Sequence, residues 1–99
     1  MEANKIIITG GATRIGAAIA KKLAGPGVEM VIHYNKSKTS AEKLKIELSK
    51  KLTKTYLIKG DLSKEKDLNK IVKFCKIKLK YFDCLINNAS LFENDKIEN

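Results

Sequence analysis

The fold is decided by residues 4–16, which read NKIIITGGATRIG. Residues 4–9 form a short β-branched run that ends at Gly10 and Gly11, as a buried strand ends at a tight turn. Beyond the turn, apolar residues recur at helical spacing, namely Ile15, Ala18, Ile19 and Leu23. Residues 25–27, GPG, then stop the helix, because glycine terminates it and proline cannot continue it. The stretch predicts a strand, a tight turn and a helix.

The same alternation continues along the chain. Further apolar strands are predicted at residues 28–33, 55–58 and 82–86. A second helix is predicted from Thr39, which stands three residues before Glu42 in the spacing of a capping box. A third helix is predicted with Ser63 as its N-cap. The apolar positions are Leu44 and Leu48 on the second helix, and Leu68, Ile71, Val72, Cys75 and Leu79 on the third.

The order of these elements is β-α-β-α-β-α-β. Continuous apolar strands joined by amphipathic helices need a parallel sheet covered on both faces, with right-handed crossovers. The predicted class is therefore α/β, a Rossmann-like doubly wound parallel sheet. With 99 residues and 43% hydrophobic content, residues 1–99 are expected to form one domain. The polar tail after Phe92 is interpreted as a loop cut short, so that the sheet is truncated after its fourth strand and its exposed edge favours association.

The composition is strongly basic. The 20 Lys and Arg against 11 Asp and Glu give a formal net charge of +9, which suits an anionic partner such as nucleic acid, lipid or a phosphate-bearing cofactor. Most lysines alternate with apolar residues in stretches 36–54 and 64–80, which indicates solvated helix faces rather than a nucleic-acid-binding tail.

Other classes of protein are disfavoured by the cysteines, the histidine and the hydropathy. Cys75 and Cys84 lack Cys-x-x-Cys spacing, and no leader-like segment is seen at the N-terminus. His33 is the only histidine, and no apolar stretch approaches the ~20 residues that span a bilayer. We expect a cytoplasmic protein with free thiols, no metal site and no membrane partner.

The glycine-rich turn has the features of a phosphate site. It brings backbone amides and a helix N-terminus close to a ligand, which favours a pyrophosphate. In this fold the end of the second strand faces the adenosine ribose, where NAD sites carry an acidic residue. Here that segment reads Tyr34-Asn35-Lys36-Ser37, so Lys36 and Arg14 could neutralise a 2'-phosphate and Ser37 could donate to it. NADP(H) is therefore favoured over NAD(H), while the alternative that both cations are ordinary surface residues stays open.

These residues resemble the short-chain dehydrogenases/reductases. The glycine motif of that family is Thr-Gly-x-x-x-Gly-x-Gly, and a later cofactor motif is Asn-Asn-Ala-Gly. Here Arg14 replaces the middle glycine, and residues 87–90 read NNAS, ending in serine. The same two departures make the chain similar to pteridine reductases and dihydromonapterin reductases.

The resemblance implies roles for particular residues. Asp61 would bind the adenine amino group with Leu62 alongside, and Asn88 would line the ribose and pyrophosphate with the two residues that follow it. Ser90 and Phe92 would contact the substrate, a pterin or related carbonyl or imine compound, with Phe92 stacking on its ring. The full set implied for the cofactor is Gly10, Arg14, Ile15, Gly16, Tyr34, Asn35, Lys36, Ser37, Asp61, Leu62, Asn88, Ala89 and Ser90. Asp61 as a turn residue, residues 87–88 as a strand end and Phe92 as a core residue remain alternatives.

No catalytic residue is assigned. The family carries a Tyr-x-x-x-Lys pair on a helix after the fifth strand, and residues 34–38, YNKSK, match only its spelling, at the adenosine end of the site. The chain is thus interpreted as the cofactor-binding half of an NADPH-dependent reductase, not catalytic alone, with homo-oligomers expected for a full-length form. Two alternatives remain: a non-catalytic remnant of a split or decaying reductase gene, and a small basic nucleic-acid-binding protein.

Overall fold

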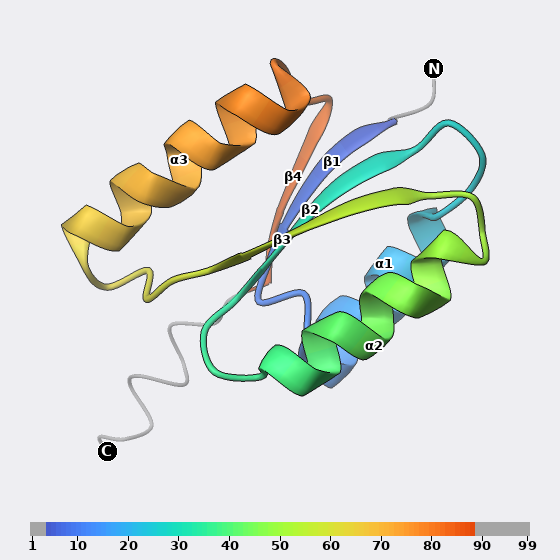
Figure 1. Cartoon of the computed structure of the whole chain (residues 1–99), viewed down its shortest axis with the longest axis horizontal. Coiled ribbons are helices and arrows are strands. Elements are labelled where there is room, and N and C mark those ends of the chain that lie inside the picture. The colour runs from blue at the N-terminus through green and yellow to red at the C-terminus, as the bar shows by residue number, and fades with distance from the viewer. Residues whose placement is uncertain (1–3, 89–99) are drawn as a thin grey trace.

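The computed structural model describes residues 4–88 as alternating strands and helices (Figure 1). The elements are β1 (Lys5–Thr9), α1 (Arg14–Leu23), β2 (Glu29–Tyr34), α2 (Lys38–Ser49), β3 (Lys54–Lys59), α3 (Glu65–Leu79) and β4 (Cys84–Asn87). The predicted order is confirmed, with boundaries shifted by one or two residues. β4 begins later than predicted because Asp83 belongs to the preceding turn, where its carboxylate accepts the backbone N–H groups of Asn4 and Lys5 at 3.1 and 2.9 Å.

The strands form one parallel sheet in the order β3-β2-β1-β4. At the centre of the sheet, Ile7 of β1 lies opposite Val31 of β2 and Leu85 of β4. Helices α1 and α2 cover one face and α3 covers the other (Figure 1). Strands are added outward from β1 to β3, and the chain then crosses back to place β4 on the other side of β1. The Rossmann-like doubly wound class is confirmed, with its switch point between β1 and β4, where such sheets bind ligands.

The core has two unequal parts because successive side chains of a strand point to opposite faces. The larger part lies under α1 and α2, and its buried members are Ile6, Ile8, Ala20, Met30, Ile32, Leu44 and Leu48. The smaller part lies under α3, where Ile7, Val31 and Leu79 are buried. The central strands β1 and β2 are thus buried on both faces, as a parallel sheet requires, whereas Leu85 of β4 is 55% exposed.

The face that α1 packs against the sheet differs in part from the predicted one. Ile15 and Leu23 are exposed to 66% and 39%, whereas Gly16 and Ala20 are buried. Small residues face the sheet because the start of α1 lies directly against the glycine turn, where a larger side chain has no room. The helical period was therefore correct, and the buried face was correct in part: Ile19 packs against the core, whereas Ile15 and Leu23 do not.

Two predicted caps are also wrong. Thr39 lies inside α2, which begins one residue earlier, after Ser37. Ser63 does not cap α3; Lys64 occupies that position, without a side-chain hydrogen bond to the helix. Instead, the backbone N–H and the hydroxyl of Ser63 both donate to Asp61 Oδ1, at 2.9 and 2.7 Å. The charge-assisted hydrogen bond to the Asp61 carboxylate orients the Ser63 hydroxyl toward Asp61 and not toward the amides of the helix.

Both cysteines, Cys75 and Cys84, are free thiols, and each is partly buried. Within residues 4–88, no helix combines the length and the apolar composition needed to cross a bilayer. The same residues contain no group of three or more His, Cys, Asp or Glu side chains arranged to hold a metal ion.

The packing of α2 makes a testable prediction. Leu48 is fully buried in the larger core, whereas Ile46 on the same helix is 59% exposed. Leu48→Ala should lower the free energy of unfolding by about 2–5 kcal/mol because it leaves a cavity. Ile46→Ala should change it by less than about 0.5 kcal/mol. Urea unfolding followed by circular dichroism measures both, and equal losses would contradict the assignment of the buried face.

Candidate functional site

The turn between β1 and α1 is closed by Thr13. Gly10 has a φ of 65°, in the left-handed region that favours glycine. Thr13 is the N-cap of α1: its hydroxyl donates to Gly10 O at 2.9 Å and accepts the Gly16 N–H at 3.1 Å. The turn and the start of the helix are therefore one hydrogen-bonded unit.

Two further glycines are required by close approach rather than by backbone conformation. A Cβ on Gly16 would lie 2.5 Å from Gly10 O and 2.7 Å from Gly11 Cα. A Cβ on Gly11 would lie 2.8 Å from Cγ2 of Ile32 in the core. The turn is thus clamped between the core and the first turn of α1, with no space for a side chain.

The first turn of α1 offers free backbone donors. In the described part of the chain, the N–H groups of Arg14 and Ile15 have no hydrogen-bond partner, as is usual for the first turn of a helix. No acidic residue lies in this turn, and the Arg14 side chain is exposed. Free amides and the positive end of the helix dipole together make an anion-binding site.

The end of β4 is hydrogen-bonded to the glycine turn from the other side of the switch point. The Asn88 amide nitrogen donates to Gly10 O and to Thr13 Oγ1, both at 2.9 Å. One residue earlier, Asn87 Oδ1 accepts the Thr9 hydroxyl at 2.8 Å. Asn88 therefore holds the glycine turn, a contact that was not predicted from the sequence. Its contact with a ribose remains a prediction.

The end of β2 presents a basic rather than an acidic surface. Tyr34 is partly buried, and residues 35–37 are exposed. Neither Lys36 nor Arg14 forms an ion pair within residues 4–88, where the one ion pair joins Lys21 to Glu47 at 2.9 Å. Since the carboxyl ends of parallel strands meet at one edge of the sheet, this segment and the glycine turn share that edge (Figure 1).

The end of β3 contributes an ordered carboxylate. The hydrogen bonds from Ser63 to Asp61 Oδ1, helped by the charges of Lys64 and Lys36, lower the pKa of Asp61 below its ordinary value. The Asp61 N–H in turn donates to Asp67 Oδ2 of α3 at 2.8 Å. Asp61 is thus ionised at neutral pH, and the effect of Lys36 on it indicates that the ends of β2 and β3 lie close together.

Sequence reasoning missed His33, which it considered only as a possible metal ligand. This buried residue lies at the end of β2, and its Nδ1 accepts the Gly10 N–H at 3.0 Å. Its Nε2 lies 2.7 Å from Gly60 O, and its backbone carbonyl accepts the Gly11 N–H at 3.0 Å. The signal in the sequence was a polar side chain near the end of an otherwise apolar strand. His33 joins the glycine turn to the turn that carries Asp61.

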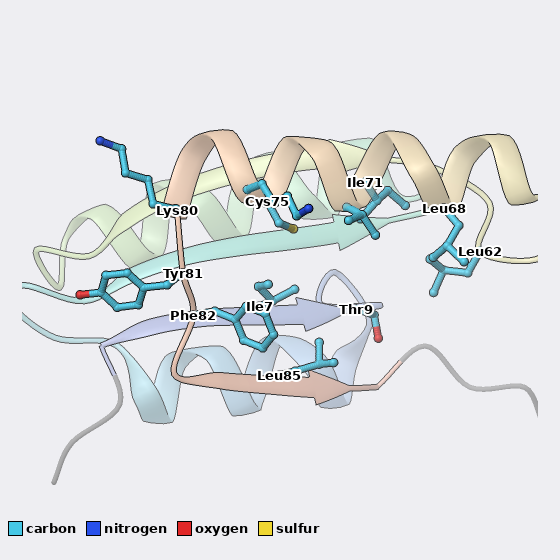
Figure 2. A pocket seen from close by; sticks show the side chains of 12 residues that line it. Ile7, Thr9, Leu62, Leu68, Ile71, Cys75, Lys80, Tyr81, Phe82 and Leu85 are labelled. Carbon is cyan, nitrogen blue, oxygen red and sulfur yellow. The ribbon is translucent and has the colours of Figure 1, made fainter.

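An apolar groove of about 500 Å³ lies on the α3 face of the sheet (Figure 2). Leu68, Ile71 and Cys75 of α3 line it on one side, and Ile7 and Leu85 line its floor from the strands. One end of the groove, at Thr9 and Leu62, lies next to the sheet edge that carries the glycine turn. Lys80 lies at the opposite end of the groove. Leu62 thus lines this groove in the structure. The groove lacks the free amides and the cations of the candidate site, so the two are separate features.

Three of the predicted residues, Ala89, Ser90 and Phe92, lie outside the described residues. The structure brings together the others at one edge of the sheet: the glycine turn with Arg14 and Ile15, the end of β2, the turn at Asp61, and Asn88. Their contacts with a cofactor remain predictions.

Comparison with known proteins finds one family along the chain. Residues 4–99 match the model of the short chain dehydrogenase family. A short-chain dehydrogenase/reductase homolog of Bacillus subtilis, YusS, is 33% identical over 89% of this chain. The crystal structure of a short-chain dehydrogenase from Oenococcus oeni covers 98% of the chain with a TM-score of 0.80 and 31% identity. That of FolM alternative dihydrofolate reductase 1 from Brucella canis, complexed with NADP, covers 89% with a TM-score of 0.76 and 32% identity.

The chain is shorter than most of these proteins. It spans 82% of YusS, but 49% of the Oenococcus chain and 35% of the Brucella chain. Of four further curated relatives it spans between 29% and 40%. The matching region corresponds to the glycine turn and the four strands described above.

The close approach at Gly16 makes a second prediction. Gly16→Ala should lower the free energy of unfolding by about 1–3 kcal/mol, because the new methyl group overlaps backbone atoms that cannot move independently. Gly25→Ala is the matched control, since nothing lies within 4 Å of its Cβ position and its φ is not positive. It should be neutral or stabilising by up to about 1 kcal/mol. Thermal and urea unfolding compare the two, and a stable Gly16→Ala variant would contradict the described packing.

Proposed function

The chain belongs to the short-chain dehydrogenase family, whose members are oxidoreductases with a nicotinamide cofactor, and from this premise we propose that residues 1–99 form one domain that binds NADP(H). The binding site is the sheet edge made by the glycine turn and the ends of β2, β3 and β4. The observation that carries the proposal is the pair of free N–H groups at Arg14 and Ile15, next to glycines that leave no room for a side chain. A pyrophosphate fits these donors.

Selectivity for NADP(H) is proposed to come from charge at the adenosine ribose. The end of β2 carries Lys36 where an NAD site carries an acidic residue, and Arg14 reaches the same edge from α1. Both cations lack ion-pair partners in the described part of the chain, so a 2'-phosphate can pair with them without displacing a carboxylate. Ser37 donates a further hydrogen bond. The similar Brucella protein crystallised as a complex with NADP, which supports this assignment.

The remaining contacts follow the ends of the strands. Asp61, ionised and held by Ser63, accepts a hydrogen bond from the adenine amino group, with Leu62 beside the ring. Tyr34 and Asn35 flank the adenosine. On the other side of the switch point, Asn88 and Ala89 line the ribose and pyrophosphate.

The chain's own part in the reaction is to hold the dinucleotide. When bound, the nicotinamide supplies a hydride to the substrate or accepts one from it. The glycine turn and α1 fix the pyrophosphate, and Thr13 and Asn88 keep the turn rigid. No catalytic residue is assigned within the 99 residues: Tyr34 and Lys38 have the Tyr-x-x-x-Lys spacing but lie at the end of β2 and the start of α2, at the adenosine end.

The proposed substrate is a pterin or a related carbonyl or imine compound. The NNAS sequence at residues 87–90 and the match to a Brucella protein named as an alternative dihydrofolate reductase support this class. Ser90 and Phe92 are the proposed substrate contacts. The free thiols of both cysteines fit a reducing compartment such as the cytoplasm. The two other hypotheses, a decayed remnant and a nucleic-acid-binding protein, gain no support from the similar proteins.

The proposed 2'-phosphate site is tested by reversing its charge. Lys36→Asp and Arg14→Ala should each weaken NADPH binding about tenfold or more, because a charge-assisted contact is lost or becomes repulsive. NADH binding should change by less than about twofold, since NADH has no 2'-phosphate. Fluorescence titration of the 99-residue chain with both nucleotides measures the ratio.

Lys50→Asp is the control for this titration. It makes the same change of charge at the other end of α2, remote from the carboxyl ends of the strands. It should leave the NADPH to NADH ratio unchanged. Equal losses of NADPH and NADH affinity in Lys36→Asp would contradict the proposed selectivity.

A further inference from the structure

We propose that His33 is a positioning residue of the dinucleotide site: it fixes the glycine turn through Nδ1 and the Asp61 turn through Nε2, and it does so only as neutral imidazole. This inference rests on the proposed function, because it concerns the affinity of the same site. His33 is buried in β2, so it acts on cofactor affinity through the two turns and not through a direct contact with the cofactor.

The hydrogen bonds of His33 determine which ring nitrogen carries the proton. The Gly10 backbone N–H can only donate, so Nδ1 at 3.0 Å must accept and cannot carry a proton. Nε2 must then be the protonated nitrogen, and it donates to Gly60 O at 2.7 Å. One neutral tautomer satisfies both backbone groups. A proton on Nδ1 would face the Gly10 N–H and abolish that hydrogen bond.

The position of Gly10 matters because it begins the phosphate-binding turn. Gly10 and Gly11 turn their N–H groups inward, to the His33 ring and to the His33 carbonyl. The turn then continues into α1, where the N–H groups of Arg14 and Ile15 are free. If the Gly10 N–H loses its hydrogen bond to His33, the turn that presents the N–H groups of Arg14 and Ile15 loses one of the contacts that hold it in place. The orientation of the anion-binding amides therefore depends on His33.

The Asp61 turn is tied to the same ring. Gly60 is buried: its carbonyl accepts from Nε2 at 2.7 Å, and its N–H donates to Tyr34 O at 3.0 Å. Asp61 follows directly and is proposed to bind the adenine. His33 thus connects the pyrophosphate and adenine ends of the site through one rigid side chain.

The surroundings of His33 favour the neutral form. Burial lowers the pKa of His33 below its ordinary value of 6.5, against the opposing effects of the Gly60 carbonyl and the Asp61 charge. Its hydrogen-bond partner Gly10 and its register partner on β3, Ile58, are both uncharged. The native chain therefore binds fewer protons than the unfolded chain below pH 6.5, so stability is greatest above that pH and falls as the pH drops.

Two substitutions separate the two hydrogen bonds. His33→Asn places an acceptor near the position of Nδ1, cannot reach Gly60 O and does not titrate; His33→Gln reaches toward Gly60 O but offers nothing at Nδ1. NADP+, which is stable in acid, is the probe at about pH 7.5 and at a pH about one unit below the native pKa of His33, which is read from the NMR titration described below. At the higher pH, His33→Gln and His33→Asn should each bind about fivefold more weakly than the native chain, because each keeps only one of the two hydrogen bonds.

The pH dependence of NADP+ affinity distinguishes this role from a purely structural one, because a purely structural role would not depend on the protonation of His33. The native chain should lose several-fold more NADP+ affinity between the two pH values than His33→Asn, whose side chain does not titrate. The 2'-phosphate of the ligand titrates equally in both measurements, so it cancels in the comparison. Identical pH profiles for the native chain and His33→Asn would overturn the proposal, as would unchanged affinity in either variant at the higher pH. If His33→Gln does not fold, the comparison of pH profiles still decides.

A ligand-free measurement separates this proposal from the proposed function. In NMR spectra of the native chain, the amide resonances of Gly10 and Asp61 should shift with the same apparent pKa as the His33 ring, and Nε2 should be the protonated nitrogen above that pKa. Independent titration of Gly10, or a proton on Nδ1, would overturn the role of His33 whether or not the chain binds nucleotide. Failure to bind NADP+ at the higher pH with linked NMR titrations would instead refute the proposed function and leave the coupling of the two turns intact.

Discussion

The approach of α1 to the glycine turn is the constraint on which the rest of the structure depends. The Cβ position of Gly16 lies 2.5 Å from Gly10 O, so the helix can start where it does only because this residue has no side chain. That contact fixes the direction of α1 across the sheet and places its first free amides at the carboxyl end of β1. It also brings Thr13 within reach of Gly10, Gly16 and Asn88. One backbone contact thus sets both the packing of a helix and the geometry of the candidate site.

Most of the fold could be predicted because it depends on patterns that are local in sequence. Apolar runs followed by glycine indicated the strands, and the parallel class follows from apolar strands joined by helices. The failures were also local. The buried face of α1 was predicted only in part, through Ile19, because the fully buried residues, Gly16 and Ala20, are too small to stand out as apolar. The capping role of Ser63 was wrong because Asp61, two residues away, takes its hydroxyl.

The candidate site was predictable only in part. Glycine spacing and the basic segment after β2 are visible in the sequence, and the structure brings them to one edge. The contacts of His33 and Asn88 were not visible, because they join Gly10 to residues 23 and 78 positions away. Such contacts depend on the register of the sheet, which places His33 beside the turn and the end of β4 next to Thr9. A buried polar residue at the end of an apolar strand is the feature to look for in similar sequences.

The unequal cover of the sheet has a consequence for motion. Within residues 4–88, α1 and α2 bury one face together and α3 is the one helix on the other face, where its Leu68 and Val72 remain 43% and 47% exposed. A segment with fewer buried contacts opens locally at a lower free energy than is needed to unfold the whole protein. α3 should therefore detach from the sheet in local excursions that leave β1, β2 and α1 intact. The hydrogen bond from the Asp61 N–H to Asp67 of α3 should open in these excursions, whereas the bond between Gly60 and His33 keeps the start of the Asp61 turn on the sheet.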